Sequence, residues 1–486
     1  MSDKVPTGYN TPIPDNIMTP DHVETRLGEL DFVDGVPTVD TTRRLFDNLD
    51  FSRAVEVFLQ CIPAASMEAM RRGNADLGAD ACNRVLIADA LMDSDPLFLT
   101  GNTDTVYVSG FMDLAADGPV VVEIPPGCGP GTVNDAWFRF VTDMGPPGPD
   151  RGQGGKYLIL PPDYDGDVPD GYFVSTSPSY SNWIILRGFL VDGKPDAAVD
   201  MFRQGLRIYP LARAGDPPAM EFISLSRKQV NTIHANTVEF YDEIAPVIAR
   251  EPLGVIDPET RGMLASIGIH KDRPFAPDDR MRKLLIEAAA VGNATARAFY
   301  FRWRESEYRL YEDRQWHTYF VGGDYEWLRD EGRGGRHLDA RTLFFYVATV
   351  NTPAMALKMI DVGSKYAGSD TDINGNMLDG ARQYRLRLPA NVPVKNFWSI
   401  CVYDTQTRSE LQTGQPYPSR NPVKDPLEYN SDGSVDLVFG PDRPTQLENN
   451  WIQTVPGKGW FGVLRLYGPQ EPWYDQTWRP GDIEPS

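Results

Sequence analysis

The sequence predicts an α+β protein in which two jelly-roll-like antiparallel β-sandwich domains flank an α-helical subdomain. Three observations predict it: short apolar runs cut by Gly and Pro between about 100 and 190, helical periodicity between about 195 and 305, and a strand pattern that returns after 380. We expect an N-terminal arm, helices followed by a first β domain, a mainly α-helical segment and a second β domain, at residues 1–40, 41–195, 196–355 and 356–486.

The composition is that of a compact acidic protein. Asp and Glu total 68 against 47 Lys and Arg, so the formal net charge is −21 and both nucleic acid and anionic membranes are repelled. No apolar run approaches the roughly 20 residues that cross a bilayer. Since the N-terminus has no signal-peptide pattern, we expect a cytoplasmic protein, or a periplasmic or secreted one if a signal was removed.

The N-terminal part divides into an arm and a helical stretch. Residues 1–38 are rich in Pro, Thr and Asp and show no period, which predicts an extended arm on the surface or on a partner. Residues 41–72 have helical spacing interrupted by Pro63, which predicts two short helices. The arm and the edge strands favour a homodimer, in which a twin chain would protect each of them.

The first β domain is predicted from strand-length apolar runs bounded by turn residues. Their spacing is typical of an antiparallel sandwich or jelly roll. The runs lie at 120–124, 136–142, 157–160, 172–176 and 183–189.

The helical segment is predicted from apolar residues that recur on one side. We expect helices at 226–250, 280–301 and 339–350, with a further helix start at Asp257–Pro258.

The second β domain repeats the first in order, which predicts an internal duplication. Segment 121–127 resembles 385–391, 136–143 resembles 396–404, and 156–164 resembles 435–443. Segment 171–178 resembles 450–456, and WIILRGF at 183–189 resembles WFGVLRLY at 460–467.

Several long segments also resemble known families. NTDTVYVSGFMDL (102–114), the stretch 136–162, SPSYSNWIILRGFL (177–190) and the stretch 449–485 resemble the tandem bacterial domains of unknown function numbered 1254 (N-terminal) and 1214 (C-terminal). The resemblance covers nearly the whole chain. It implies two jelly-roll-like β domains with an α-helical part, and it implies no settled activity.

The motifs of common enzyme classes are absent from the sequence. It has no G-x-S-x-G elbow, no H-E-x-x-H motif, no Walker loop and no G-x-G-x-x-G pattern that opens a helix. The Gly-rich segment 146–156 carries Arg151 and Lys156. Its backbone N–H groups and two cations predict a carboxylate or phosphate site, and a long hairpin loop is the alternative.

A polar turn precedes the strand that begins near residue 106. It contains Asn102, Asp104 and Tyr107. One interpretation is a turn closed by Asx-type hydrogen bonds. The other makes Asp104 a general base or metal ligand, Tyr107 a proton donor or orienting residue, and Asn102 a substrate contact.

The segment DTDINGNMLDG (370–380) begins like an EF-hand loop but has Ala381 where a bidentate Glu is required. An Asn-Gly hairpin turn is one interpretation. The other is a loose calcium site, the one cofactor the sequence suggests, with ligands Asp370, Asp372, Asn374 and Asp379.

Three further residues are candidates for a cleft. His234 lies on the apolar side of its predicted helix, as a core histidine or a general base. Arg139 and Asp143 would share a face of a regular strand, as a structural ion pair or a cleft pair. Arg302 belongs to a stretch of cations and aromatics that can hold a carboxylate or neutralise acidic neighbours.

Two functions follow from these candidates. The first is an enzyme of hydrolase or lyase type acting on a small organic or carboxylate substrate between the β domains and the helices. Asp104 and His234 would be its acid and base, Tyr107 the orienting residue, and Arg139 and Arg302 the electrostatic clamps. The alternative is a ligand- or carbohydrate-binding protein without chemistry that uses exposed Trp side chains such as those at 471–478.

Overall fold

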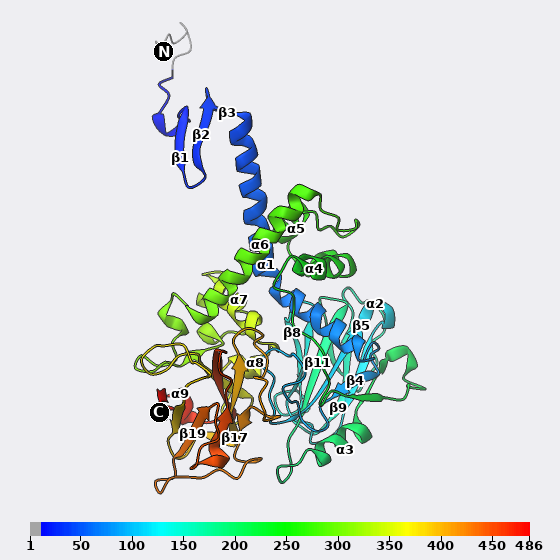
Figure 1. Cartoon of the computed structure of the whole chain (residues 1–486). Coiled ribbons are helices and arrows are strands. Elements are labelled where there is room, and N and C mark those ends of the chain that lie inside the picture. The colour runs from blue at the N-terminus through cyan, green and yellow to red at the C-terminus, as the bar shows by residue number, and fades with distance from the viewer. Residues whose placement is uncertain (1–10) are drawn as a thin grey trace.

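The computed structural model describes residues 11–486 and shows two β domains side by side beneath a group of helices. The N-terminal ribbon and the first turns of helix α1 (Val39–Asp76) project away from this body (Figure 1). The α+β class predicted from the sequence is confirmed.

The first β domain consists of two sheets that enclose a common apolar core, to which Val108, Ile184, Val122 and Ile159 belong. The six-stranded sheet has the order β13 (Glu221–Ser224), β4 (Arg84–Ile87), β5 (Val106–Asp113), β11 (Ser181–Gly188), β7 (Gly131–Asp135) and β8 (Phe140–Met144). The four-stranded sheet has the order β10 (Phe173–Thr176), β9 (Gly155–Leu160), β6 (Val120–Ile124) and β12 (Arg207–Pro210).

The second β domain has the same plan, with a core that includes Ile400, Leu464, Leu386 and Leu437. Its five-stranded sheet has the order β14 (His317–Thr318), β15 (Ser364–Ser369), β21 (Trp460–Pro469), β17 (Val394–Asp404) and β18 (Ser419–Arg420). Its four-stranded sheet has the order β20 (Trp451–Gln453), β19 (Val435–Gly440), β16 (Tyr384–Leu388) and β22 (Ile483–Pro485).

The two β domains have the same strand order, which supports the internal duplication. The series β5-β11-β7-β8 corresponds to β15-β21-β17-β18, and β10-β9-β6-β12 corresponds to β20-β19-β16-β22. Four of the five segment matches fall on corresponding strands. The match of 136–143 with 396–404 is wrong, because β17 corresponds to β7, the strand that ends at Asp135.

Three of the four domain sheets are mixed, and the five-stranded sheet is antiparallel, so the expectation of wholly antiparallel sandwiches is wrong. The strand pairs β9–β10, β4–β13 and β19–β20 are parallel. Apolar periodicity predicts that a segment is a strand, but it does not predict whether the strand runs parallel or antiparallel to its neighbour. The long connection between β9 and β10 allows the chain to return in the same direction.

Helix α1 is one helix of 38 residues, and the prediction of two short helices broken at Pro63 is wrong. A proline at position 63 cannot donate to the carbonyl of Leu59. The hydroxyl of Thr342 donates to that carbonyl at 3.3 Å instead, and the helix around it is buried. A tertiary hydrogen bond therefore satisfies the group that the proline leaves unpaired.

The other helices pack around α1 or cover the β domains (Figure 1). Helices α6 and α7 lie close to the predicted ranges. Helix α4 begins only at Glu239, so the prediction that residues 226–238 are helical is wrong. Their bounds are α2 Leu114–Asp117, α3 Asp196–Gly205, α4 Glu239–Arg250, α5 Pro258–Ser266, α6 Asp279–Phe301, α7 Leu338–Val347, α8 Pro353–Ala356 and α9 Glu471–Tyr474.

The N-terminal segment is not a wholly extended arm. Strands β1 (His22–Thr25), β2 (Gly28–Val33) and β3 (Val36–Pro37) form a small ribbon, so that part of the prediction for 1–40 is wrong, while residues 1–10 lie outside the described chain. The turn between β1 and β2 uses Gly28 with φ of 88°. Exposed apolar side chains follow on β3 and α1, with Val39 90% exposed. The homodimer stays a prediction.

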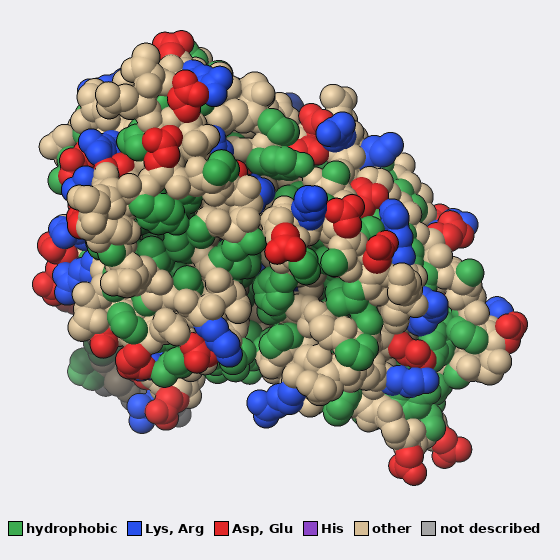
Figure 2. Space-filling model, turned by 90° about the horizontal axis from the view of Figure 1, so that it is seen from below, with side chains coloured by type: hydrophobic (Ala, Val, Ile, Leu, Met, Phe, Trp, Pro, Cys, Tyr) green, Lys and Arg blue, Asp and Glu red, His purple; other side chains and the backbone are tan. Residues whose placement is uncertain are grey.

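Surface charge is distributed evenly on the face that Figure 2 shows, where acidic and basic side chains are interspersed among hydrophobic ones. Within residues 11–486, none of the helices combines the length and the apolar character that a membrane span requires. The four cysteines, Cys61, Cys82, Cys128 and Cys401, are buried and unpaired.

Candidate functional site

A small cavity lies between the two β domains, where strands of both central sheets meet the segment that leads from α7 to α8. Its volume is about 30 Å³, which is room for roughly two water molecules or one carboxylate group. The polar and charged side chains on its wall are Thr100, Tyr107, Arg187, Tyr319, Thr349, Tyr366 and Arg465.

The two arginines occupy corresponding positions in the duplicated sheets. Arg187 of β11 lies opposite Tyr107 of β5, and Arg465 of β21 lies opposite Tyr366 of β15. The Arg187 guanidinium carbon is 5.8 Å from the Tyr107 ring centre, and that of Arg465 is 5.3 Å from the Tyr366 ring centre. The cavity is therefore lined by two copies of one Arg–Tyr cross-strand pair.

Both arginines are buried without a carboxylate partner. Arg187 is 7% exposed and Arg465 is 5% exposed, and within residues 11–486 neither forms an ion pair. The Nε atoms of both are enclosed and have no hydrogen-bond partner. A buried guanidinium without a counter-ion is costly, so an anion in this cavity would be strongly favoured.

The protein satisfies the two arginines unequally. Arg465 donates from Nη2 to the carbonyls of Thr100 at 2.5 Å and Gly101 at 3.1 Å, and to the Tyr403 hydroxyl at 2.7 Å. Arg187 has no such set of carbonyl acceptors. The carboxylate of Asp143 is in its neighbourhood but accepts the Thr352 hydroxyl at 2.6 Å and 2.7 Å.

The tyrosines of the wall are hydrogen-bond donors at neutral pH. Burial raises the pKa values of Tyr107 and Tyr319, so their hydroxyls stay protonated. The Tyr319 hydroxyl lies 2.8 Å from that of Tyr300. With two permanent cations and protonated hydroxyls, the wall presents donors to whatever occupies the cavity.

The polar turn before β5 has the Asx-type structure that was one of its two interpretations. The Asn102 side-chain oxygen accepts the N–H groups of Asp104 at 2.9 Å and Thr105 at 3.1 Å. Its amide nitrogen donates to the Tyr107 hydroxyl. Asn102 therefore closes the turn and also holds Tyr107 at the cavity.

Comparison with known proteins agrees with the two-domain plan. Residues 82–210 match the family model "Protein of unknown function (DUF1254)", and residues 363–471 match "Protein of unknown function (DUF1214)". The chain carries these two domains in tandem. Arg187 lies in the DUF1254 region and Arg465 in the DUF1214 region, so each domain contributes one arginine to the cavity.

A solved structure shares the fold of this DUF1254–DUF1214 chain. The crystal structure of the VPA0106 protein from Vibrio parahaemolyticus is similar with a TM-score of 0.54 and 17% identity, covering 90% of this chain and 100% of that one. An uncharacterised protein from Burkholderia cenocepacia has a TM-score of 0.40 and 12% identity, covering 92% and 96%. None of the curated proteins compared with the chain matches it.

Asp104 lies behind the cavity and not on its wall. Its carboxylate accepts the Asn421 amide at 3.3 Å and lies 3.8 Å from the Cys401 sulfur. Glu410 is buried nearby with both oxygens unpartnered, and burial raises its pKa well above the ordinary range. Asp104 thus belongs to a buried acidic cluster between the DUF1254 and DUF1214 regions, and the structure does not place it as a base on the cavity.

His234 is a core histidine rather than a residue of the cavity wall. It lies in the loop before α4, where Nδ1 is 3.0 Å from the Ala235 carbonyl oxygen and the ring packs against Phe240. Burial, with help from Arg408, lowers its pKa to about 3. The predicted grouping of His234 with Asp104 and Tyr107 does not occur, because the expected helix begins after it.

The pair of Arg139 with Asp143 is wrong. Strand β7 ends at Asp135 and β8 begins at Phe140, so residues 136–139 form a turn in which Phe138 has φ of 54°. The alternation that would place Arg139 and Asp143 on one face is broken there. Arg139 pairs with Asp135 at 2.5 Å instead.

The Gly-rich segment cradles a carboxylate, and that carboxylate is the protein's own Asp150. Its oxygens accept the N–H groups of Gly145 at 2.7 Å and of Gly152 and Gly154 at 3.1 Å, together with the Tyr157 hydroxyl. The anion site predicted for this segment is thereby filled.

The cations proposed for that site, and Arg302, lie elsewhere on the surface. Arg151 is exposed, and Lys156 pairs with Glu123 at 2.9 Å. Arg302 is exposed at the end of α6 and donates to the carbonyl of Phe301 at 2.7 Å. None of the three contributes to the cavity wall.

We expect Asp150→Ala to destabilise the DUF1254 region by about 3 kcal/mol, because three backbone N–H groups and a buried hydroxyl lose a charged acceptor. Thermal unfolding measures the effect. Asp165→Ala, at an exposed carboxylate in the following loop, should change stability by less than about 0.5 kcal/mol. Equal effects of the two substitutions would contradict the structural role of Asp150.

The acidic loop of the DUF1214 region is a turn. Asp372 accepts the N–H groups of Asn374 at 2.9 Å and Asn376 at 3.0 Å, and Asp379 accepts that of Ala381 at 2.9 Å. Asp370 faces the buried His317 at 3.9 Å. Within residues 11–486 these carboxylates do not converge as metal ligands, so calcium binding stays a prediction that their placement does not favour.

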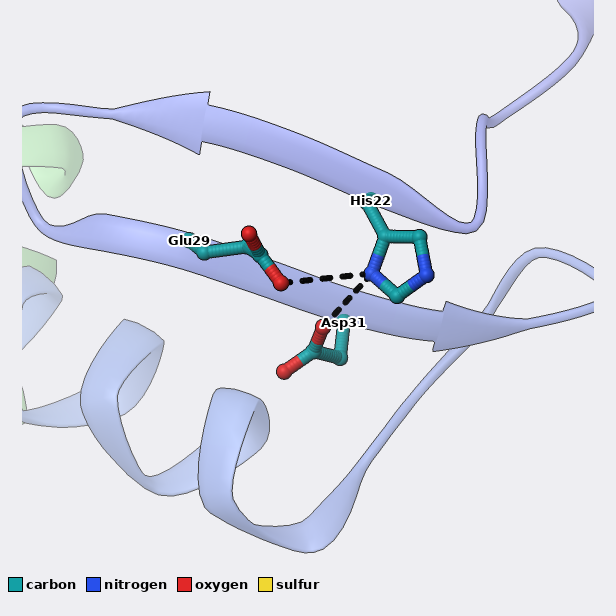
Figure 3. A group of neighbouring side chains, drawn as sticks. All are labelled: His22, Glu29 and Asp31. Carbon is teal, nitrogen blue, oxygen red and sulfur yellow. Dashed lines mark hydrogen bonds and ion pairs between the residues drawn. The ribbon is translucent and has the colours of Figure 1, made fainter.

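Two other groups have ligand atoms close enough for a metal ion. On the N-terminal ribbon, His22 Nδ1 lies 2.8 Å from Asp31 and 3.4 Å from Glu29; His22 and Glu29 are exposed, and Asp31 is partly exposed (Figure 3). The carboxylates raise the pKa of His22, as in an ion pair. The second group, Glu305, Glu307 and His337, surrounds the guanidinium of Arg329, which already supplies the cation.

The aromatic surface suggested for saccharides is not present at 471–478. Trp473 and Trp478 are both buried, and Trp478 donates its indole N–H to the Pro389 carbonyl at 3.3 Å. The carbohydrate-binding form of the alternative therefore loses the Trp side chains that were its example, and binding of another ligand stays a prediction.

Proposed function

We propose that this protein binds a small organic carboxylate in the cavity between the DUF1254 and DUF1214 regions, with Arg187 and Arg465 holding the carboxylate group. The proposal depends on one observation: two buried guanidinium groups, at corresponding positions of the duplicated sheets, border one cavity without a carboxylate partner. Guanidinium groups bind carboxylates through paired, charge-assisted hydrogen bonds.

The rest of the wall suits the remainder of such a ligand. Tyr107 and Tyr366 lie beside the two arginines and can donate further hydrogen bonds. Ile185, Val463 and Met355 provide apolar contacts for a short carbon chain. The volume of about 30 Å³ favours an acid of few carbons, and a larger one would require side chains to move.

The chemistry that this wall favours is proton transfer rather than hydrolysis. The cavity wall contains no Ser, Cys, His, Asp or Glu among the described residues, so it lacks an activated nucleophile. A protonated tyrosine such as Tyr107 or Tyr319 is the available acid. If the protein is an enzyme, we propose a lyase-type reaction on the carboxylate, and the alternative is binding without turnover.

The test is a titration of the protein with matched neutral and anionic ligands. We expect acetate, pyruvate and succinate to raise the melting temperature in a saturable way, whereas acetamide, which has nearly the shape of acetate, does not. Arg187→Met should abolish the shift, while Arg203→Met, at an exposed arginine paired with Asp89, should retain it. Equal shifts with acetate and acetamide, or retention in Arg187→Met, would overturn the proposal.

A further inference from the structure

A second and much larger cleft lies on the helical side of the DUF1254 region. It has a volume of about 940 Å³ and shares no wall residue with the cavity between the β domains. Its walls come from the turn after β7, the start of α5 and the segment that leads into α7. A volume of this size accommodates a drug-sized molecule.

Four arginines line this cleft: Arg139, Arg261, Arg336 and Arg341. Arg139 alone among them pairs with a carboxylate within residues 11–486, that of Asp135. The other three donate to neutral groups. Arg261 donates to the carbonyls of Leu253 and Ile256, and Arg336 donates to the carbonyl of Glu326. Arg341 donates to the side-chain oxygen of Gln60 at 2.9 Å.

The acidic side chains of the cleft do not neutralise these cations. Asp257 caps α5, where its oxygens accept the N–H of Thr260 at 2.8 Å and the hydroxyl of the same residue at 2.7 Å. Glu326 contributes its carbonyl to Arg336 and forms no ion pair within the described chain. The cleft wall therefore carries four arginines and two carboxylate residues, although acidic residues outnumber basic ones by 68 to 47 in the whole chain.

Arg336 and Arg341 lie close enough to repel one another. Burial, reinforced by the charge of Arg336, lowers the pKa of Arg341 to about 10. The Nε of Arg341 is enclosed and has no hydrogen-bond partner. An anion between these two side chains would relieve both the repulsion and the burial of charge.

Aromatic rings form much of the remaining wall. The Trp327 and Phe345 ring centres are 5.1 Å apart, and those of Phe140 and Tyr325 are 5.8 Å apart. Trp137, which is 8% exposed, adds to the same wall, whereas Phe138 is fully buried beside it. Such a wall favours a flat apolar body next to the cationic groups.

We infer that this cleft binds an organic anion with an aromatic body, with Arg336 and Arg341 holding the charged group and the rings of Tyr325 and Phe140, which are partly exposed, contacting the body. The inference does not depend on the carboxylate cavity, because the two sites share no residue and the cleft admits a far larger ligand.

The test uses a fluorescent aromatic anion, 8-anilinonaphthalene-1-sulfonate, and its neutral analogue N-phenyl-1-naphthylamine. We expect the full-length protein to bind the anion at one saturable site, with energy transfer from tryptophan that falls in Trp327→Phe. Arg336→Gln, at an exposed side chain, should weaken binding of the anion at least five-fold and change the affinity for the neutral probe by less than two-fold. The double variant Arg336→Gln/Arg341→Gln should weaken binding of the anion further.

The matched control is Phe46→Ser on the projecting part of α1, where exposed apolar side chains could also attract the probe. Binding of the anion should be unchanged in this variant. The inference is overturned if Phe46→Ser removes binding, if Arg336→Gln does not weaken it, or if the neutral probe loses as much affinity as the anion.

Discussion

Replacement of Arg187 by Met is expected to stabilise the ligand-free protein while it abolishes carboxylate binding. Within residues 11–486 Arg187 is buried, lacks an ion pair and has an enclosed Nε without a partner, so tyrosine rings such as Tyr107, and no carboxylate, offset the cost of burying its charge. Replacement of a buried ion pair by apolar side chains of similar volume is neutral or stabilises proteins by about 1 to 4 kcal/mol, and a buried charge that lacks its partner carries the same kind of desolvation cost. At about 2–4 °C per kcal/mol, the melting temperature should rise by several degrees.

The control for this prediction is the corresponding arginine of the other domain. Arg465→Met leaves the carbonyls of Thr100 and Gly101 and the Tyr403 hydroxyl without their donor, so it should lower the melting temperature. Scanning calorimetry in ligand-free buffer measures both variants. A lower melting temperature for Arg187→Met would show that Arg187 is structural and would remove the main support for the carboxylate site.

Replacement of Glu68 by Gln is expected to cause a large loss of stability. Glu68 of α1 is 1% exposed and bonds Arg71 at 2.8 Å, Arg72 at 2.9 Å and Arg250 of α4 at 3.1 Å. Removal of one member of a buried ion-pair network costs about 3 to 5 kcal/mol, and the lower end applies because the arginines are partly exposed. Thermal unfolding at pH 7 measures this effect.

The same carboxylate makes the stability of the protein depend on pH. Although burial opposes its ionisation, the arginines lower the pKa of Glu68 from 4.5 to about 2. Its contribution is therefore complete above about pH 4.5 and is lost as the pH falls from about 4.5 to about 2. Glu68→Gln should flatten the stability profile in this range, whereas Glu471→Gln, at an exposed ion pair with Lys358, should leave it unchanged. A profile of Glu68→Gln as steep as that of the original protein would contradict the role of the network.

The fold could be predicted as far as local periodicity reaches. Short apolar runs between Gly and Pro identify strands, and their recurrence in order identifies the duplicated domains. The direction of β10, β13 and β20 was not predictable, because pairing direction depends on the path of the connecting chain. The length of α1 was not predictable either, since the group that Pro63 leaves unpaired is satisfied by Thr342, 283 residues away along the chain.

The candidate site could be predicted only in part. Tyr107 and Asn102 were recognised because polar residues crowd the turn before a strand, and both lie at the cavity or hold a residue there. Arg187 and Arg465 were missed, although a signal existed: each interrupts an apolar strand, and the two positions coincide when WIILRGF is aligned with FGVLRLY. Arg139 was assigned the wrong partner because the strand ends before it.

By itself the sequence determined the α+β class, the duplicated strand order and an acidic surface charge, because each follows from the identity and spacing of neighbouring residues. Tertiary structure alone decided that Arg187 and Arg465 border one cavity and that Arg336 and Arg341 line one cleft. The physical reason is that the affinity of an arginine for an anion depends on burial and on which carboxylates lie within reach. Both are properties of distant segments that only folding brings together.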